Sequence, residues 1–249
     1  MSTMENRQQA VQRLASAQKS ARGAGGYSRW VNRPVGRQLA ALAYVWGWTP
    51  NRVTALSALC SAAGILVLAL VHPGIGMAVA VAVLLALGYA LDSADGQLAR
   101  LRGGGSAGGE WLDHVVDAVK VSSLHAAVLI SWYRFFDLPR EALLLVPLVF
   151  GVVQASSYFA LTLTDQLRRV TAAKAGQSAV ATPLVNPHEH APVLASLLVL
   201  PVDYGLLCVV MLLLAAPPVF VVVYTLVMLA NLAYFLLGCA RWYREMSAL

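Results

Sequence analysis

Four aspartates lie close together in the sequence, at the junction of two apolar stretches. Asp92 and Asp95 are three residues apart, and Asp113 and Asp117 are four apart. In a helix each of these spacings places both side chains on one face. A short glycine-rich segment, 103–109, connects the two stretches, so the helices would be antiparallel neighbours. We therefore predict that the four carboxylates converge at one site.

Carboxylates gathered at one site repel each other and resist transfer out of water. Three arrangements would relieve this cost: raised pKa values, pairing with Lys or Arg, or bound cations. Oxygen ligands without His or Cys at ligand spacing favour Mg²⁺ or Mn²⁺ over zinc. Four carboxylates are enough for two such ions, as in phosphoryl displacements, and one carboxylate could take the proton of an attacking hydroxyl. A cation or proton relay in a transporter is the rival hypothesis, because intramembrane acids often mark such paths.

The apolar stretches around these aspartates are long enough to cross a lipid bilayer. Of the 249 residues, 59% are hydrophobic and 12% are charged, and the mean hydropathy is +0.66. A soluble domain carries roughly a quarter charged residues. We predict an all-α membrane protein, a bundle of six transmembrane helices preceded by an interfacial amphipathic helix. The predicted spans, each about 20 residues or slightly longer, are about 52–72, 76–98, 110–133, 141–164, 191–215 and 219–240.

The remaining segments are polar or interfacial. Residues 1–33 form a polar N-terminal arm, expected to be a weak helix or a flexible chain, and residues 34–249 form one membrane domain. Residues 34–48 suit a helix along the membrane surface, with nearby tryptophans at headgroup depth. A polar loop is expected over 165–190, and Asp203 within the fifth span is expected inside the bundle.

The distribution of basic residues predicts the orientation. An even number of spans places both termini on one side, where fifteen Lys and Arg residues fall, against two, Arg134 and Arg140, on the other. Basic residues accumulate on the cytoplasmic side. We therefore expect the termini and the aspartates to face the cytoplasm at the cell (inner) membrane. The net charge of +6 comes without a nucleic-acid-binding motif, so nucleic acid is not an expected partner.

The residues around the aspartates resemble a known motif. The pattern is Asp92-x-x-Asp95-Gly96-x-x-Ala99-Arg100, eight residues, Gly109-x-x-x-Asp113-x-x-x-Asp117. It matches the defining motif of the CDP-alcohol phosphotransferase (CDP-alcohol phosphatidyltransferase) family at every position. A weaker similarity is Thr49-Pro50-Asn51-x-x-Thr54 at the start of the first span, and the six-span layout extends the resemblance over about residues 30–245.

The resemblance implies a role for each matched position. The metal ligands would be Asp92, Asp95, Asp113 and Asp117, sharing two divalent cations, Mg²⁺ or Mn²⁺. Asp117 would also be the general base. The CDP-alcohol site would comprise Gly96, Ala99, Arg100, Gly109, Asn51 and Thr54. Within it, Gly96 and Ala99 would leave room for cytidine and Arg100 would pair with the pyrophosphate.

The implied reaction is attack of an acceptor hydroxyl on the β-phosphorus of a CDP-alcohol, with CMP leaving, in phospholipid biosynthesis. We expect the donor to be CDP-diacylglycerol, the acceptor a small alcohol or phosphoalcohol, and the enzyme a homodimer in the membrane lipid. Relatives that use inositol phosphate usually carry an arginine where this chain has Ala118, which argues against that acceptor.

Two alternatives remain open. The stretch Gly109-Glu110-Trp111-Leu112-Asp113-His114 resembles choline and ethanolamine phosphotransferases, in which CDP carries the polar alcohol and the acceptor is a lipid. A cation-coupled transporter or a degenerate, non-catalytic family member is the second. The intact motif favours the enzyme, and a transporter would be expected to show repeated halves.

Four basic residues are candidates for the acceptor pocket. Lys120 lies one turn beyond Asp117, and a lysine within a span usually pairs with an acid or faces a cavity. Arg168, Arg169 and Lys174 could bind an acceptor phosphate, although a role in membrane topology accounts for them equally well.

Overall fold

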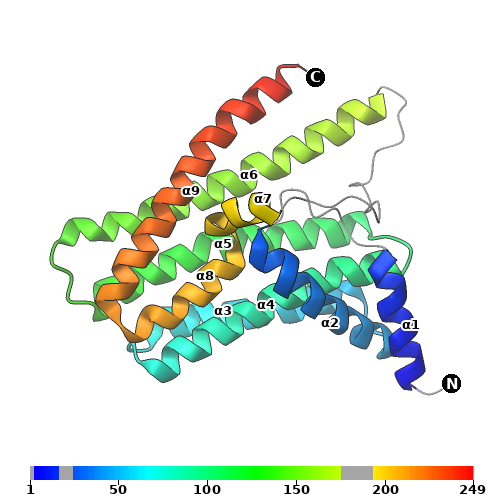
Figure 1. The fold of residues 1–249 in the computed structure, drawn as a ribbon, viewed down its shortest axis with the longest axis horizontal. Helices are drawn as coiled ribbons and strands as arrows, with labels where there is room; N and C mark the ends of the chain where they lie inside the picture. The colour runs from blue at the N-terminus through cyan, green and yellow to red at the C-terminus, as the bar shows by residue number, and fades with distance from the viewer. Residues whose placement is uncertain (1–2, 17–24, 175–192, 249) are drawn as a thin grey trace.

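The computed structural model describes residues 3–16, 25–174 and 193–248, and their regular structure is helical throughout (Figure 1). The helices are α1 Thr3–Ser16, α2 Arg33–Val45, α3 Pro50–Leu70, α4 Ile75–Leu101, α5 Ala107–Phe135, α6 Leu145–Lys174, α7 Val193–Leu198, α8 Tyr204–Val210 and α9 Pro217–Met246. Short 3₁₀ or π-helical turns cover Ser28–Asn32, Glu141–Leu144, Leu200–Val202 and Met211–Ala215.

Five of these helical segments are long and apolar enough to cross a membrane. They are α3, α4, α5, the segment Glu141–Lys174 that includes α6, and α9. A shorter apolar segment follows, Tyr204–Ala215. These findings confirm the all-helical, multi-pass class, whereas the count of six spans is not confirmed.

The fifth predicted span, 191–215, is not one continuous helix. Residues 191 and 192 lie outside the described residues, and the rest is divided among α7, α8 and two 3₁₀ turns. Pro201 lies in the first of these turns, and it has no N–H to donate to a continuous helix. Asp203 then starts a new helix, because its side chain accepts a hydrogen bond from the backbone N–H of Gly205 at the beginning of α8. A polar cap inside the predicted span therefore divides it.

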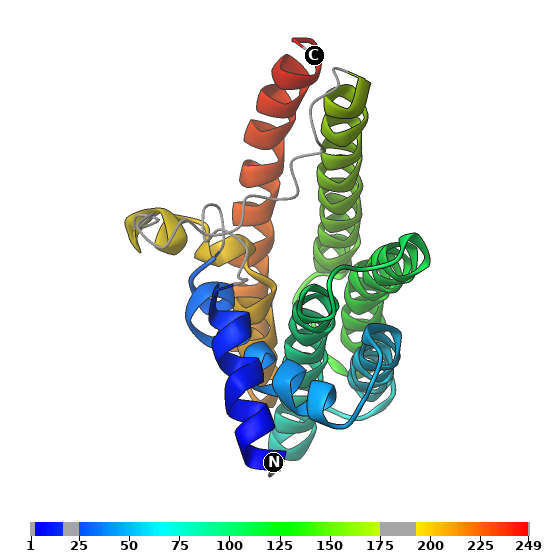
Figure 2. The same cartoon turned by 90° about the vertical axis from the view of Figure 1, so that its right-hand side faces the viewer.

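The predicted loop 165–190 is wrong over 165–174, where α6 continues as a helix; 175–190 lies outside the described residues. Arg168 on this extension forms ion pairs with Asp165 and with Glu245 on α9. The polar residues are thus the surface of a helix rather than a loop. Figures 1 and 2 show the C-terminal halves of α6 and α9 extending beyond the rest of the bundle.

Two groups of buried side chains hold the bundle together. The larger one is centred on aromatic residues, including Trp132, Phe150 and Tyr224, and there a ring nitrogen of His125 lies 2.6 Å from the Tyr224 hydroxyl. The smaller one joins α1 and α2 to α4 and includes the fully buried Leu14 and Leu98. The helical part of the predicted N-terminal arm is therefore packed against the bundle. The division at residue 33 stays a prediction.

Glycine and capping residues fix the connection between α4 and α5. Gly103 and Gly104 have φ angles of +93° and +130°, which side chains other than glycine rarely adopt. Ser106 then caps α5, where its hydroxyl accepts a hydrogen bond from the Gly109 N–H at 3.0 Å. The predicted turn is therefore confirmed.

The packing of these helices differs from the expectation in one respect. α3 packs closely against both α4 and α5, while α4 and α5 come close to each other at few backbone positions. The contact between α3 and α4 is tight, because Ser57 donates a hydrogen bond to the Gly88 carbonyl at 2.8 Å. The relative position of α4 and α5 therefore depends on the contacts that each of them makes with α3.

Candidate active site between α4 and α5

Three of the predicted metal ligands come together. Asp92 on α4 and Asp113 and Asp117 on α5 each present a carboxylate oxygen within 4.8 Å of the other two. α4 brings its residue from the end of the helix, and α5 brings two residues one turn apart from its beginning. Among the described residues, this is a group with the composition and spacing that a hard divalent cation requires.

The fourth predicted ligand, Asp95, lies beside this group but is engaged differently. Its side chain is 5% exposed and accepts a hydrogen bond of 2.6 Å from the Thr54 hydroxyl on α3. Thr54 therefore contacts the site through an aspartate. This bond also explains why a threonine one turn into α3 belongs to the same site as the aspartates of α4.

Lys120 supplies a positive charge to the carboxylates. Its Nζ lies 2.5 Å from Asp117 Oδ1 and 3.4 Å from Asp92 Oδ1, and the lysine is 7% exposed. The prediction that this lysine pairs with an acid is confirmed. Pairing with a lysine is one of the three arrangements that could relieve the repulsion, and bound cations could add to it.

A cavity of about 210 Å³ opens beside the carboxylates. The residues from the sequence motif that line it are Asp92, Asp95, Gly96, Arg100 and Asp113. Among the described residues, a Cβ added at Gly96 would meet only the Arg100 guanidinium, at 3.7 Å. The backbone of α4 is therefore open to the cavity at Gly96, as the predicted approach of a nucleotide would require.

The other predicted nucleotide-binding residues are not among those that line this cavity. Asn51 Oδ1 would be 3.0 Å from a Cβ at Gly109, so the starts of α3 and α5 lie close together here. Ala99 lies near Gly105 in the turn that follows α4. Of the predicted nucleotide-binding residues, Gly96 and Arg100 line the cavity. The roles of Asn51, Ala99 and Gly109 stay predictions.

The predicted acceptor residues on α6 are separate from the cavity. Arg168 pairs with Glu245 at 2.7 Å, and Arg169 pairs with Glu110 at 2.5 Å. Lys174 is exposed at the end of α6. These contacts give the two arginines a structural use, and acceptor binding by Arg168, Arg169, Lys174 and Lys120 stays a prediction.

Sequence reasoning missed one wall of the cavity. The additional lining residues are Ser28, Asn32, Arg33, Tyr89, Ser93 and Gln97. The first three precede or begin α2, far from the motif in sequence, and Arg33 was counted only as one of the basic residues that set the topology. The other three follow one face of α4 at intervals of four residues, which is a signal that the sequence did contain.

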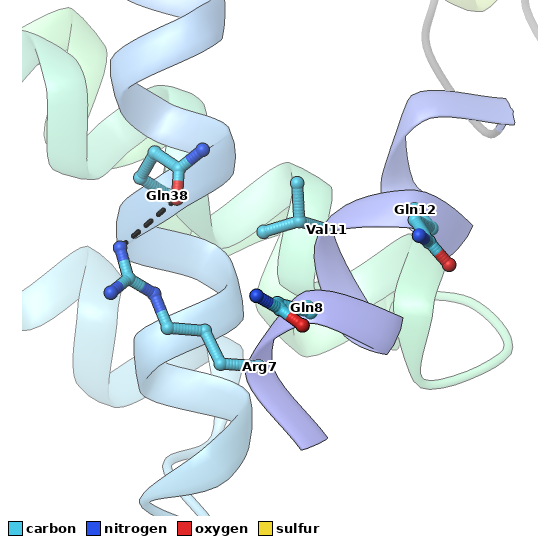
Figure 3. Close-up of a pocket in the computed structure, with 5 residues that line it drawn as sticks. All are labelled: Arg7, Gln8, Val11, Gln12 and Gln38. Carbon is cyan, nitrogen blue, oxygen red and sulfur yellow. Dashed lines mark hydrogen bonds between the residues drawn. The ribbon is translucent and has the colours of Figure 1, made fainter. Parts of the chain in front are cut away.

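A second hollow, of about 580 Å³, lies between α1 and α2 (Figure 3). Its lining residues are Arg7, Gln8, Val11, Gln12 and Gln38. The Arg7 guanidinium donates a hydrogen bond of 3.0 Å to the Gln38 side chain. This lining contains no carboxylate, so it has no ligand set for a divalent cation.

Comparison with known proteins finds a matching family model and solved structures of similar fold. Residues 47–237 match the model of a protein family described as CDP-alcohol phosphatidyltransferase. No curated protein matches the chain.

Two solved structures of Mycobacterium tuberculosis phosphatidylinositol phosphate synthase are similar in fold. The one in complex with manganese and citrate has a TM-score of 0.52 at 19% identity, covering 86% of this chain and 89% of that chain. The one with CDP-DAG bound has a TM-score of 0.50 at 20% identity, covering 86% and 94%. At these identities the likeness establishes a shared fold.

Proposed function

The chain belongs to the CDP-alcohol phosphatidyltransferase family, and we propose that it transfers a phosphatidyl group from CDP-diacylglycerol to a small alcohol or phosphoalcohol, with release of CMP. It is a multi-pass membrane enzyme of the CDP-alcohol phosphotransferase class. The observation that carries the proposal is the group of three carboxylates beside a cavity that also contains Arg100 and the open face of Gly96. The CDP-DAG bound to the similar structure supports this choice of donor.

The residues at the site fit one or two divalent cations. Asp92, Asp113 and Asp117 offer oxygen ligands, Asp95 could join them if it exchanged its bond to Thr54, and neither His nor Cys competes within the group. When bound, Mg²⁺ or Mn²⁺ would offset the charge of the pyrophosphate and of the leaving CMP. The similar structure that contains manganese supports a metal of this kind.

The protein's own residues would then position the donor and move the proton. The Arg100 guanidinium would bind the pyrophosphate, and the open backbone at Gly96 would admit the cytidine. Asp117 would accept the proton of the acceptor hydroxyl. The hydroxyl oxygen would then bond to the β-phosphorus, and the bond from that phosphorus to CMP would break. Lys120, 2.5 Å from Asp117, would hold that carboxylate in position.

We also propose that the enzyme acts as a homodimer in the cell (inner) membrane, with the aspartates at its cytoplasmic face. The distribution of Lys and Arg supports this orientation. A site at the membrane edge suits the reaction, because the phosphate groups of a lipid donor lie at the interface while its acyl chains stay in the bilayer.

The test is CMP release by the purified protein with Mg²⁺ or Mn²⁺ and CDP-diacylglycerol. Serine, glycerol 3-phosphate, inositol 1-phosphate and buffer alone are compared as acceptors. We expect CMP only with a particular acceptor, and Ala118 makes inositol 1-phosphate the least favoured of the three. CMP formed only from CDP-choline or CDP-ethanolamine with diacylglycerol would support the alternative direction of transfer. No CMP from any pair would contradict both and favour a non-catalytic member.

A further inference from the structure

A buried carboxylate fixes the segment before α2 to α8. Asp203, 7% exposed, accepts a hydrogen bond from the Ser28 backbone N–H at 2.8 Å and another from the Gly205 N–H at 2.9 Å. The Tyr27 ring packs so closely on Gly205 that an added Cβ there would overlap it. The segment 25–33 therefore cannot leave α8 without removing the Ser28 bond and leaving a buried carboxylate with one partner fewer.

The other side of the same segment is fixed to α4. The Asn32 side chain donates a hydrogen bond to the Tyr89 carbonyl, and the Gln97 side chain donates one to the Arg33 carbonyl, each at 3.2 Å. A Cβ added at Gly36, in the first turn of α2, would lie 2.8 Å from the Ser93 hydroxyl. Tyr89, Ser93 and Gln97 form one face of α4, so the segment lies along that face in a single defined position.

This position brings the Arg33 side chain to the cavity beside the aspartates. Arg33 and Arg100 both line it, together with Asp92, Asp95 and Asp113. Arg33 is half-buried, and this burial lowers the pKa of its guanidinium, while Tyr89 raises it. Arginine has so high an ordinary pKa that Arg33 still carries its charge at neutral pH. The cavity is thus bounded by carboxylates and by two guanidinium groups.

The proposed donor offers phosphate oxygens to more than one positive group, in addition to any bound cation. A CDP-alcohol contains a pyrophosphate with two negative charges, and a guanidinium binds phosphate oxygens through two parallel hydrogen bonds. Arg100 alone supplies one such group. Building on the phosphatidyl transfer proposed above, we infer that Arg33 is a second phosphate-binding residue of this cavity and contacts the pyrophosphate of the CDP-alcohol together with Arg100. The segment 25–33, which the sequence motif does not include, is then one wall of the donor site.

Binding of CDP to the purified full-length protein with Mn²⁺, measured by titration calorimetry, tests this inference. We expect Arg33→Ala to weaken CDP binding by about 10- to 100-fold, the usual effect of losing charged hydrogen bonds. Arg33→Lys should restore part of the affinity, because lysine keeps the charge but not the paired geometry. Arg29→Ala is the matched control: it removes the same charge from the same segment, but its guanidinium contacts Ser196 and is not among the cavity-lining groups.

Several outcomes would overturn the inference. The inference would be overturned if the Arg33→Ala protein bound CDP as tightly as the wild type. It would also be overturned if Arg33→Ala and Arg29→Ala lost CDP affinity to the same extent. If Arg33→Ala lowers the melting temperature, the Arg33→Lys protein provides the test instead. A stable Arg33→Lys protein with the CDP affinity and the KM for CDP-diacylglycerol of the wild type would count against the inference. A change confined to the KM of the acceptor would reject the donor assignment. Absence of CDP binding by the wild type would instead remove the proposed donor, and the role of Arg33 with it.

Discussion

Asp117 is the clustered carboxylate closest to Lys120 and the residue proposed to accept the proton. Asp117→Asn keeps the size of the side chain and removes the base, so CMP formation should fall by about 100- to 10,000-fold. Binding of CDP should be largely retained, because Asp117, unlike Asp92, is not among the residues that line the cavity. Asp92→Asn is the comparison, since loss of that ligand should weaken both Mn²⁺ and CDP binding. Full turnover by Asp117→Asn would show that another group takes the proton.

Lys120 stabilises the same carboxylates in the absence of metal. Its ammonium contacts Asp117 and Asp92, and it is 7% exposed. Lys120→Met leaves these carboxylates without that partner, which should destabilise the metal-free protein by about 3 kcal/mol. Added Mn²⁺ replaces the missing positive charge. We therefore expect a lower melting temperature in EDTA and a larger rise on adding Mn²⁺ than in the wild type.

The control for Lys120 is Lys174→Met, which removes the same charge from an exposed position at the end of α6. It should leave both melting temperatures unchanged. An identical response to Mn²⁺ in Lys120→Met and the wild type would show that the lysine and the cation do not serve the same carboxylates.

At the scale of the helix, α4 uses its glycines in two ways. A Cβ at Gly96 would face the cavity, whereas one at Gly88 would overlap the Ser61 side chain on α3. Gly96→Leu should therefore abolish CDP binding with little change in melting temperature, while Gly88→Leu should lower the melting temperature, as overpacking by about 1–3 kcal/mol would. Calorimetry and thermal unfolding of both variants check this. Unchanged CDP affinity in Gly96→Leu would contradict the close approach of the nucleotide to α4.

The helices that carry the motif were predictable because their signals are local. Asp92, Asp113 and Asp117 converge as their spacing indicates, and glycines form the turn between them. Two other elements could not be predicted from local signals. The extension of α6 is polar and becomes recognisable as a helix only through its pairing with α9, for example Arg168 with Glu245. The apolar run after residue 192 is long enough for a span, but the cap at Asp203 breaks it.

At the scale of the whole molecule, the wall of the cavity that the sequence did not predict is formed through contacts between distant segments. Ser28 meets Asp203 across 175 positions of the chain, and Asn32 meets Tyr89 across 57. No periodicity or spacing in the first 33 residues indicates such partners. The same holds for α3, whose position against both α4 and α5 depends on the packing of small residues such as Ser57 and Gly88.

The orientation of the whole bundle is a prediction from charge that chemical labelling can test. Arg100 and Arg102 lie at one end of the α4–α5 pair and Arg134 at the other. Gly105 and Asp137 are exposed in the connections at these two ends, after α4 and after α5. Gly105→Cys and Asp137→Cys can be introduced singly after the native Cys60, Cys208 and Cys239 are replaced by alanine.

Because basic residues stay in the cytoplasm, a maleimide that does not cross membranes should label the Asp137→Cys protein in intact spheroplasts and leave the Gly105→Cys protein unlabelled. Inside-out vesicles should give the opposite pattern, which controls for the reactivity of each thiol. Labelling of Gly105→Cys from outside the cell would place the aspartates on the external face. The enzyme would then have no direct access to a cytoplasmic acceptor, and the proposed reaction would need a substrate supplied from outside.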